Sequence, residues 1–241
     1  MIVGIIPARY QSVRFPGKPL TSINGVPMIE RVYRQALKST QLSEVVVATD
    51  HQDIYDTIQK IGGKVLMTSE YHRNGTERCA EVAELLDAEF VVNIQGDEPF
   101  INPYQIDQVC NLLENGAEIA TLKKRIEQKE ELLSSNVVKV VTDIRNRALY
   151  FSRSPIPYPK EQVTDDLLVC QEFHKHLGIY GFKKTTLFQL MNLEPSKLET
   201  YEGLEQLRWL ENQFEITVGL TEFESLGIDT PKDLEKIAAF E

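Results

Sequence analysis

Short runs of β-branched residues alternate along this chain with stretches that have helical spacing. Strands buried on both faces of a sheet have this type of apolar run, and the runs are Ile2–Ile6, Val45–Val47, Phe90–Ile94 and Val137–Val141. Apolar residues three and four positions apart predict helices from about Pro27 and around Ile54–Ile61, Cys79–Leu86 and Ile106–Leu113. The alternation through about residue 125 indicates βαβ units and a mostly parallel sheet, whose ligands bind at the carboxyl ends of the strands.

The pattern changes after about residue 135. Two strand-like segments, residues 137–142 and Ala148–Phe151, follow closely, and the Pro-rich stretch Ser154–Pro159 comes next. We therefore expect a β-rich lobe inserted at about residues 145–200.

The C-terminal part of the chain is expected to rejoin the main sheet. A helix is predicted over Tyr201–Asn212, a strand over Ile216–Leu220, and a final capped helix over residues 229–235. Residues 1–241 are thus predicted to form a single α/β domain, a Rossmann-like mostly parallel sheet flanked by helices, with the small lobe inserted.

Charge and cysteine usage exclude several classes of protein. The 241 residues hold 26 Lys and Arg against 36 Asp and Glu, a net charge of -10, which argues against a protein that coats nucleic acid or an anionic membrane. The cysteines Cys79, Cys110 and Cys170 are widely spaced and form no CxxC pattern, so a reducing, cytoplasmic location is expected. Pro7 and Arg9 end the apolar N-terminal run before a signal peptide or membrane span would be complete.

The loop after the first strand is the strongest candidate for an anion site. Residues 1–29 contain Arg9, Arg14 and Lys18 and no acid. The loop is not a Walker motif, since Gly17-Lys18 is followed by Pro19, and it has no GxGxxG pattern. Its cations either grip several anionic oxygens or are scattered on a solvated loop. A position at the carboxyl end of a strand favours the anion site.

Two acids are candidates for a Mg²⁺ site. Asp97 follows the strand around residues 90–94, and Asp229 precedes the final predicted helix. Mg²⁺ takes one or two protein carboxylates together with phosphate and water oxygens. Taken singly, Asp97 is equally a turn residue and Asp229 a helix cap, so only their proximity in the fold would make a metal site.

The predicted lobe and the segment after it carry polar groups that each allow two interpretations. His174 and His176 are two apart, which on a strand places both on one face, where a sugar contact or a structural histidine is expected. Arg153 either binds a carboxylate or is structural. Glu205 and Gln206 lie on an amphipathic segment whose default is a solvated face.

Taken in order, these segments resemble the cytidylyltransferases that make CMP-3-deoxy-D-manno-octulosonate, the CMP-Kdo synthetases. The stretches that carry the resemblance are IIPARYQSVRFPGKPL, VVVATDHQDI, GTER, VVNIQGDEPFI, NVVKVV, ALYFSRSPIP, HLGIYGF, LEQLR and GIDTP. The resemblance implies a nucleotidyltransferase fold with a lobe for sugar binding and dimerisation, a Mg²⁺ cofactor and a cytosolic homodimer.

The resemblance also implies site residues. Those expected at the nucleotide are Ala8, Arg9, Arg14, Lys18, Asp50, His51, Gly75, Arg78 and Gln95. Those expected at the sugar are Gln95, Arg153, His176, Tyr180, Glu205 and Gln206. Asp97 and Asp229 are the implied metal ligands, and Lys18, Arg14 and Asp97 the implied catalytic groups.

The implied reaction joins CTP and Kdo to give CMP-Kdo and pyrophosphate, for synthesis of the lipopolysaccharide inner core. Two alternatives stay open at this point: a cytidylyltransferase for the 8-amino analogue of Kdo or another acidic sugar, and an inactive sugar-nucleotide binder. An NAD(P)-dependent oxidoreductase is disfavoured because the glycine fingerprint of such enzymes is missing.

Overall fold

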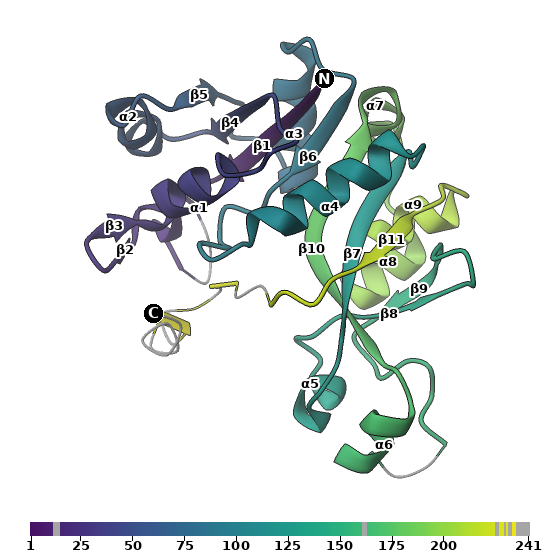
Figure 1. Cartoon of the computed structure of the whole chain (residues 1–241). Coiled ribbons are helices and arrows are strands. Elements are labelled where there is room, and N and C mark those ends of the chain that lie inside the picture. Colours follow the sequence, from purple (N-terminus) through teal and green to yellow (C-terminus); the bar gives the residue numbers. More distant parts are fainter. Residues whose placement is uncertain (12–14, 161–162, 225–226, 229, 231–232, 235–241) are drawn as a thin grey trace. The chain divides into compact units, whose positions relative to one another are not determined.

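A computed structural model describes the chain except residues 12–14, 161–162, 225–226, 229, 231–232 and 235–241 (Figure 1). The chain divides into two units, the first formed by Met1–Cys110 with Glu224–Glu241 and the second by Asn111–Phe223. Among the described residues, no helix combines the length and the apolar character needed to cross a membrane.

A parallel sheet forms the centre of the first unit. Its strands are β1 (Ile2–Ala8), β4 (Glu44–Thr49), β5 (Lys64–Met67) and β6 (Phe90–Asn93), in the order β6-β1-β4-β5. Each neighbouring pair is parallel. Burial of nearly every residue of β1 explains why its sequence is continuously apolar. The parallel arrangement predicted from the sequence is confirmed.

The helices of the first unit start and stop where the sequence signals them. They are α1 (Met28–Ala36), α2 (Gln52–Lys60), α3 (Gly75–Glu84) and α4 (Pro103–Glu114), the last running on into the second unit. Pro27 precedes α1, and Gly62 follows α2 with a φ of 74°. A short 3-10 turn η1 (Lys18–Leu20) and the two-residue strands β2 (Ser22–Ile23) and β3 (Val26–Pro27) lead from the β1 loop into α1.

The second unit is a mixed sheet with short helices. Its strands are β7 (Ile119–Arg125), β8 (Lys139–Thr142), β9 (Ala148–Ser152), β10 (His174–Lys183) and β11 (Thr217–Leu220). β10 is antiparallel to β7 and β8, β9 is antiparallel to β8, and β11 is parallel to β7. Its helices are α5 (Lys129–Leu133), α6 (Asp165–Cys170), α7 (Lys184–Met191), α8 (Lys197–Glu202) and α9 (Gln206–Glu211).

One predicted helix is wrong, and one lies mostly outside the described residues. The segment Tyr201–Asn212 is not continuous, because Gly203 adopts a φ of 62° and separates α8 from α9. In the final predicted helix, Asp229 falls outside the described residues, while Thr230 donates its backbone N–H to Asp233 Oδ2 over 2.9 Å. The expected strands are present, and their observed ends differ from the predicted ones by a few residues.

Candidate active site

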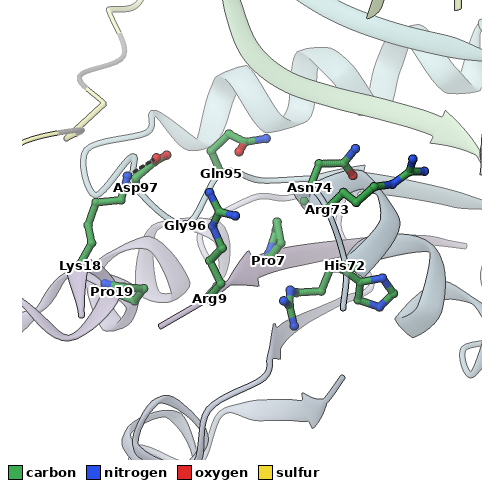
Figure 2. Close-up of a pocket in the computed structure, with 13 residues that line it drawn as sticks. Pro7, Arg9, Lys18, Pro19, His72, Arg73, Asn74, Gln95, Gly96 and Asp97 are labelled. Atoms are coloured by element: carbon green, nitrogen blue, oxygen red, sulfur yellow. Dashed lines mark hydrogen bonds and ion pairs between the residues drawn. The ribbon is translucent and has the colours of Figure 1, made fainter. Parts of the chain in front are cut away.

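A polar pocket of about 350 Å³ lies at the carboxyl end of the first unit's sheet (Figure 2). It is lined by Pro7, Ala8, Arg9, Lys18, Pro19, His72, Arg73, Asn74, Gly75, Arg78, Gln95, Gly96 and Asp97. Seven of the residues predicted at the nucleotide or metal therefore line one pocket, although they come from three separate segments of the sequence. The juxtaposition follows from the topology, because β1 and β6 are neighbouring parallel strands whose carboxyl ends meet at one edge.

Lys18 and Asp97 form an ion pair at one end of this pocket. Lys18 Nζ lies 2.6 Å from Asp97 Oδ2, and the two side chains are 14% and 32% exposed (Figure 2). Gly17 turns the loop before Lys18 with a φ of 70°, and its N–H donates to the Tyr10 carbonyl over 3.0 Å. The turn returns a loop that left the sheet at β1 to the end of β6, so that the lysine reaches Asp97.

Arg78 lines the pocket and is held in place by the carboxylate of Asp50. Its side chain is only 3% exposed, and its Nη2 donates to Asp50 Oδ2 over 2.7 Å. Its Nη1 donates to Thr68 Oγ1 and, over 3.2 Å, to the Ser69 carbonyl. Each of these partners follows β4 or β5, so the guanidinium is fixed by the ends of the two strands.

An aromatic pair lies beside this ion pair. Tyr10 and His51 stack with their ring centroids 3.9 Å apart and an interplanar angle of 13°. The Tyr10 N–H also donates to Asp50 Oδ1 over 3.3 Å. Asp50 and His51 do not line the pocket themselves; they contact residues of the segments that do.

Three residues that sequence reasoning missed, His72, Arg73 and Asn74, line the far end of the pocket (Figure 2). Asn74 caps α3, its Oδ1 accepting from the Glu77 N–H over 2.9 Å. Arg73 Nε donates to Glu77 Oε1 over 2.6 Å, and His72 Nε2 pairs with Glu81 Oε2. The missed signal was a basic pair directly ahead of the helix start at Gly75, where backbone N–H groups favour anions.

Glu81 is held ionised by these contacts. Burial by itself disfavours the charged carboxylate, but hydrogen bonds from His72 and from the Ser69 N–H lower its pKa below the ordinary value. The His72–Glu81 pair thereby ties the loop ahead of α3 to the body of that helix.

Gly96, Gly75 and Pro7 form the floor of the pocket. A Cβ placed on Gly96 would lie 2.7 Å from the Pro7 carbonyl oxygen, and one placed on Gly75 would lie 3.1 Å from Pro7 Cγ. No side chain fits at Gly96 without movement of the backbone. The start of α3 and the turn after β6 thus both close directly on the end of β1.

Two predicted residues, Arg14 and Asp229, lie outside the described residues. The residue before Asp229 in the sequence is placed: the Ile228 N–H donates to the Asp97 carbonyl over 2.9 Å. Ile228 is fully buried with Ile23 and Met28. Within the described part of the chain, no three His, Cys, Asp or Glu side chains gather as a metal-binding group.

The residues predicted at the sugar, Gln95 apart, belong to the second unit. His176 and Tyr180 lie on β10 with ring centroids 5.2 Å apart, and Tyr180 meets Trp209 of α9 edge to face at 5.1 Å. Glu205 and Gln206 stand at the start of α9, and Gln206 is buried rather than on a solvated face. Burial and, second, the charge of Glu205 raise the pKa of Tyr180.

Arg153 joins β9 to two loops of the second unit. Its Nε donates to the Glu202 carbonyl over 2.7 Å, its Nη1 to the Ser135 carbonyl over 3.0 Å and its Nη2 to the Gly203 carbonyl over 3.4 Å. The ammonium of the fully buried Lys139 binds the Arg153 carbonyl itself, so this arginine is anchored at both its backbone and its side chain.

A mostly parallel α/β fold with a pocket lined by Arg9, Lys18, Arg73 and Arg78 at its strand ends is typical of enzymes of the nucleotidyltransferase class. The family model described as cytidylyltransferase matches residues 3–217. The chain therefore belongs to the cytidylyltransferase family, and within it to the 3-deoxy-manno-octulosonate cytidylyltransferases.

Individual relatives support this membership along the whole chain. The 3-deoxy-manno-octulosonate cytidylyltransferase of Thermodesulfovibrio yellowstonii is 47% identical over 240 residues, covering 96% of this chain and 94% of the relative. That of Parabacteroides distasonis is 47% identical over 245 residues, covering 99% and 97%. A solved structure of CMP:2-keto-3-deoxy-manno-octonic acid synthetase complexed with CTP superposes with a TM-score of 0.92 at 39% identity, covering 99% of this chain and 97% of that one.

Proposed function

We propose that this protein transfers CMP from CTP to the anomeric C2 hydroxyl of Kdo, giving CMP-Kdo and pyrophosphate for lipopolysaccharide inner-core synthesis. One observation carries the proposal: the basic loop after β1, the Asp97 turn after β6 and the start of α3 converge on one pocket in a chain of this family. Phosphoryl-type transfer needs mainly positioning and charge stabilisation from the protein, and these groups provide both.

The pocket is proposed to hold CTP. Arg9, Arg14 and Lys18 would grip the triphosphate, with the N–H groups at the start of α3 supporting one phosphate group. Arg78, anchored by Asp50, would contact the nucleotide next to Gly75. The base is proposed to bind near Asp50 and His51. Ala8 and Gln95 complete the nucleotide contacts, and Gln95 Nε2 is already held by Asn93 Oδ1 over 3.3 Å.

Mg²⁺ is the proposed cofactor, with Asp97 and Asp229 as its protein ligands. The donor chemistry fits, because the pocket lining offers the Asp97 carboxylate and no cysteine, and its histidine, His72, is paired with Glu81 at the far end. The hydrogen bond from Ile228 to Asp97 supports the pairing, since Asp229 follows Ile228 in the sequence and consecutive Cα atoms are about 3.8 Å apart. When bound, Mg²⁺ neutralises phosphate charge and acidifies a coordinated hydroxyl.

Lys18 is the proposed main source of charge stabilisation on the leaving pyrophosphate, together with Arg14. In the structure the Lys18 ammonium is paired with Asp97. A lysine ammonium on a flexible stem can leave one anion for another, whereas a guanidinium fork is bound to a fixed geometry. We therefore infer that Lys18 turns from Asp97 to a phosphate oxygen when the substrate binds.

Within the second unit, the acceptor sugar is proposed to bind at Arg153, His176, Tyr180, Glu205 and Gln206. The Arg153 guanidinium carries five N–H groups, and backbone carbonyls take three of them. The two that remain are proposed to bind the carboxylate of a 2-keto acid sugar, a group that neutral aldoses lack.

Assembly and location are further proposals. We infer that both units act as one cytidylyltransferase domain, and that the protein is a cytoplasmic homodimer. An apolar edge supports the dimer: β9 pairs with β8 alone among the described strands, and Leu149 on β9 is 61% exposed. The unpaired cysteines, two of them buried, suit a reducing compartment.

Pyrophosphate release from CTP and Mg²⁺ tests the activity. Release should require added Kdo, and kcat/KM for Kdo should exceed that for its 8-amino analogue and for a sialic acid. Release that does not depend on Kdo would contradict the proposal. A higher kcat/KM for another acidic sugar would support cytidylyl transfer but assign a different acceptor.

A further inference from the structure

The hydroxyl of Thr121 sits beneath the His176 ring in the core of the second unit. Thr121 is fully buried on β7, opposite the point where β10 bulges between Leu177 and Tyr180. Its Oγ1 lies 2.9 Å from His176 Nε2, 2.7 Å from the Ile179 carbonyl oxygen and 3.2 Å from the Leu177 carbonyl oxygen. One hydroxyl therefore meets two carbonyls and one imidazole nitrogen.

Counting protons fixes the direction of these hydrogen bonds. Carbonyl oxygens only accept, and a threonine hydroxyl has one proton to give. If that proton went to His176, both carbonyls would face lone pairs of the hydroxyl oxygen at hydrogen-bond distance. The hydroxyl therefore donates to the carbonyl side, with Ile179 the shorter contact, and accepts from His176 Nε2.

The His176 ring is consequently a neutral Nε2–H tautomer. Burial lowers the pKa of His176 to about 3, so the second ring nitrogen, Nδ1, carries no proton at neutral pH. The described residues offer Nδ1 no hydrogen-bond partner, and the side chain remains partly exposed. Phe151, edge-on at 5.1 Å, and Tyr180 flank the ring and limit its rotation.

A second polar group beside His176 also lacks a partner. The Tyr180 hydroxyl is buried, its side chain is 8% exposed, and within the described part of the chain nothing hydrogen-bonds to it. A buried hydroxyl without a partner costs roughly 1–3 kcal/mol and calls for an explanation. The neighbouring charge of Glu205 and the burial both keep this hydroxyl protonated, and so able to donate.

We propose that Thr121 is a positioning residue that holds His176 as the Nε2–H tautomer, so that Nδ1 accepts a hydrogen bond from a hydroxyl group of the acceptor sugar while Tyr180 donates one. The inference deepens the proposed function and rests on it for the identity of the ligand. Thr121 itself touches no substrate: it selects which nitrogen of His176 presents a lone pair. The site then accepts a hydrogen bond from the sugar through His176 Nδ1 and donates one through the Tyr180 hydroxyl.

The tautomer is tested directly by long-range ¹H–¹⁵N correlation on ¹⁵N-histidine-labelled protein without substrate. The chain has four histidines, so His176→Gln assigns the signal by its loss. We expect a pyridine-type Nδ1 and a pyrrole-type Nε2 for His176 that persist from pH 5 to pH 8. A proton on Nδ1, or an averaged pair of shifts, would overturn the proposal whether or not the protein acts on Kdo.

Steady-state kinetics test the functional half. Thr121→Val keeps the side-chain shape and removes the hydroxyl, so KM for Kdo should rise about fivefold, the worth of one hydrogen bond, while KM for CTP stays unchanged. Thr121→Ser retains the hydroxyl and should restore the wild-type KM. Equal values for Val and Ser, or a rise confined to CTP, would refute the role of Thr121.

Tyr180→Phe keeps the test decisive if Thr121→Val fails to fold. Removing a hydroxyl that has no partner in the protein should leave the thermal midpoint unchanged or raised, yet increase KM for Kdo by a similar factor. A lowered midpoint with unchanged KM would show that the hydroxyl serves the fold and not the ligand. If the wild type did not turn over Kdo at all, that result would contradict the proposed function. The tautomer of His176 could still be measured, because that experiment uses no substrate.

Discussion

The Lys18 ammonium and the Asp97 carboxylate, 2.6 Å apart, neutralise each other at one end of the pocket. These two groups have opposite proposed tasks, one toward phosphate and one toward Mg²⁺. In the proposed roles, Mg²⁺ would replace Lys18 as the partner of Asp97, and the triphosphate would replace Asp97 as the partner of Lys18. Binding of the Mg²⁺–CTP complex would therefore replace the Lys18–Asp97 ion pair by two new ones. If Mg²⁺ bound alone, Lys18 would lose its partner, and if CTP bound alone, Asp97 would lose its partner.

Asp97→Asn should lower kcat/KM by about a hundredfold or more, because the electrostatic stabilisation at a developing charge is of this order. The Mg²⁺ concentration that gives half the maximal rate should also rise. The measurements are a magnesium titration of the rate and a thermal melt. Glu114→Gln, which changes an exposed acid at the end of α4, is the matched control and should keep normal kinetics. Near-normal kcat with unchanged magnesium dependence would remove Asp97 from the metal site.

Asp50→Ala should lower the free energy of unfolding by about 3 kcal/mol, since it leaves the buried Arg78 guanidinium without its carboxylate. KM for CTP should rise with it, because Arg78 would no longer be fixed. Urea denaturation and KM measurements check both effects. Glu30→Ala breaks the exposed pair with Arg34 and should cost under about 1 kcal/mol. A cost for Asp50→Ala as small as that for Glu30→Ala would contradict the anchoring role.

Arg153→Ala should raise KM for Kdo and also lower stability by about 1–2 kcal/mol, because three backbone carbonyls lose their donor. Arg153→Lys keeps the charge without the planar fork. It should recover part of the stability and little of the Kdo affinity. Separate KM values for Kdo and CTP, with thermal melts, distinguish these effects. A loss confined to CTP would move Arg153 out of the sugar site.

His176 makes stability depend on pH in a predictable direction. Burial lowers its pKa from 6.5 to about 3, so between these values the unfolded chain binds a proton that the folded chain does not. Acidification below about pH 6.5 should therefore destabilise the wild type, by up to about 1.4 kcal/mol per pH unit from this group. His176→Gln should lack this contribution. Urea denaturation at pH 4.5, 5.5 and 7 measures the difference, and identical pH slopes for the two proteins would refute it.

The basic loop and Asp97 could be placed at one edge from the sequence because the sheet is parallel. Ala8 and Asp97 end or follow strands that alternate with helices, and neighbouring parallel strands bring their carboxyl ends together whatever their distance in the sequence. A loop with three cations and no acids, placed at such an edge, favours an anionic ligand. The convergence of the loop after β1 with the turn after β6 therefore follows from strand order. The other expected pocket residues came from the family resemblance: Ala8, Gly75, Arg78 and Gln95.

Other features of the fold and site depend on three-dimensional geometry that the spacing of residues in the sequence does not encode. The break at Gly203 replaces an apolar helical pattern with two short helices, because the left-handed conformation of one glycine decides the outcome. Thr121 is one of fifteen threonines in the sequence, and its apolar neighbours in the chain do not mark it as part of a polar site. Its importance comes from a bulge in β10 that turns two carbonyls toward it. His72 and Arg73 join the site through ion pairs to Glu81 and Glu77, which hold the loop ahead of α3 against that helix.

The floor of the pocket is formed by Gly96 and Gly75, which have no side chains, and by Pro7. Substitutions that arise under selection change side chains, and this floor presents almost none to change. A side chain at Gly96 would have to displace the backbone at the end of β1 and would thereby disrupt the proposed CTP site. An inhibitor that takes its affinity from contacts with this floor would thus leave the protein few routes to resistance, whereas one that depends on the exposed side chain of Arg73 could be escaped by a single codon change.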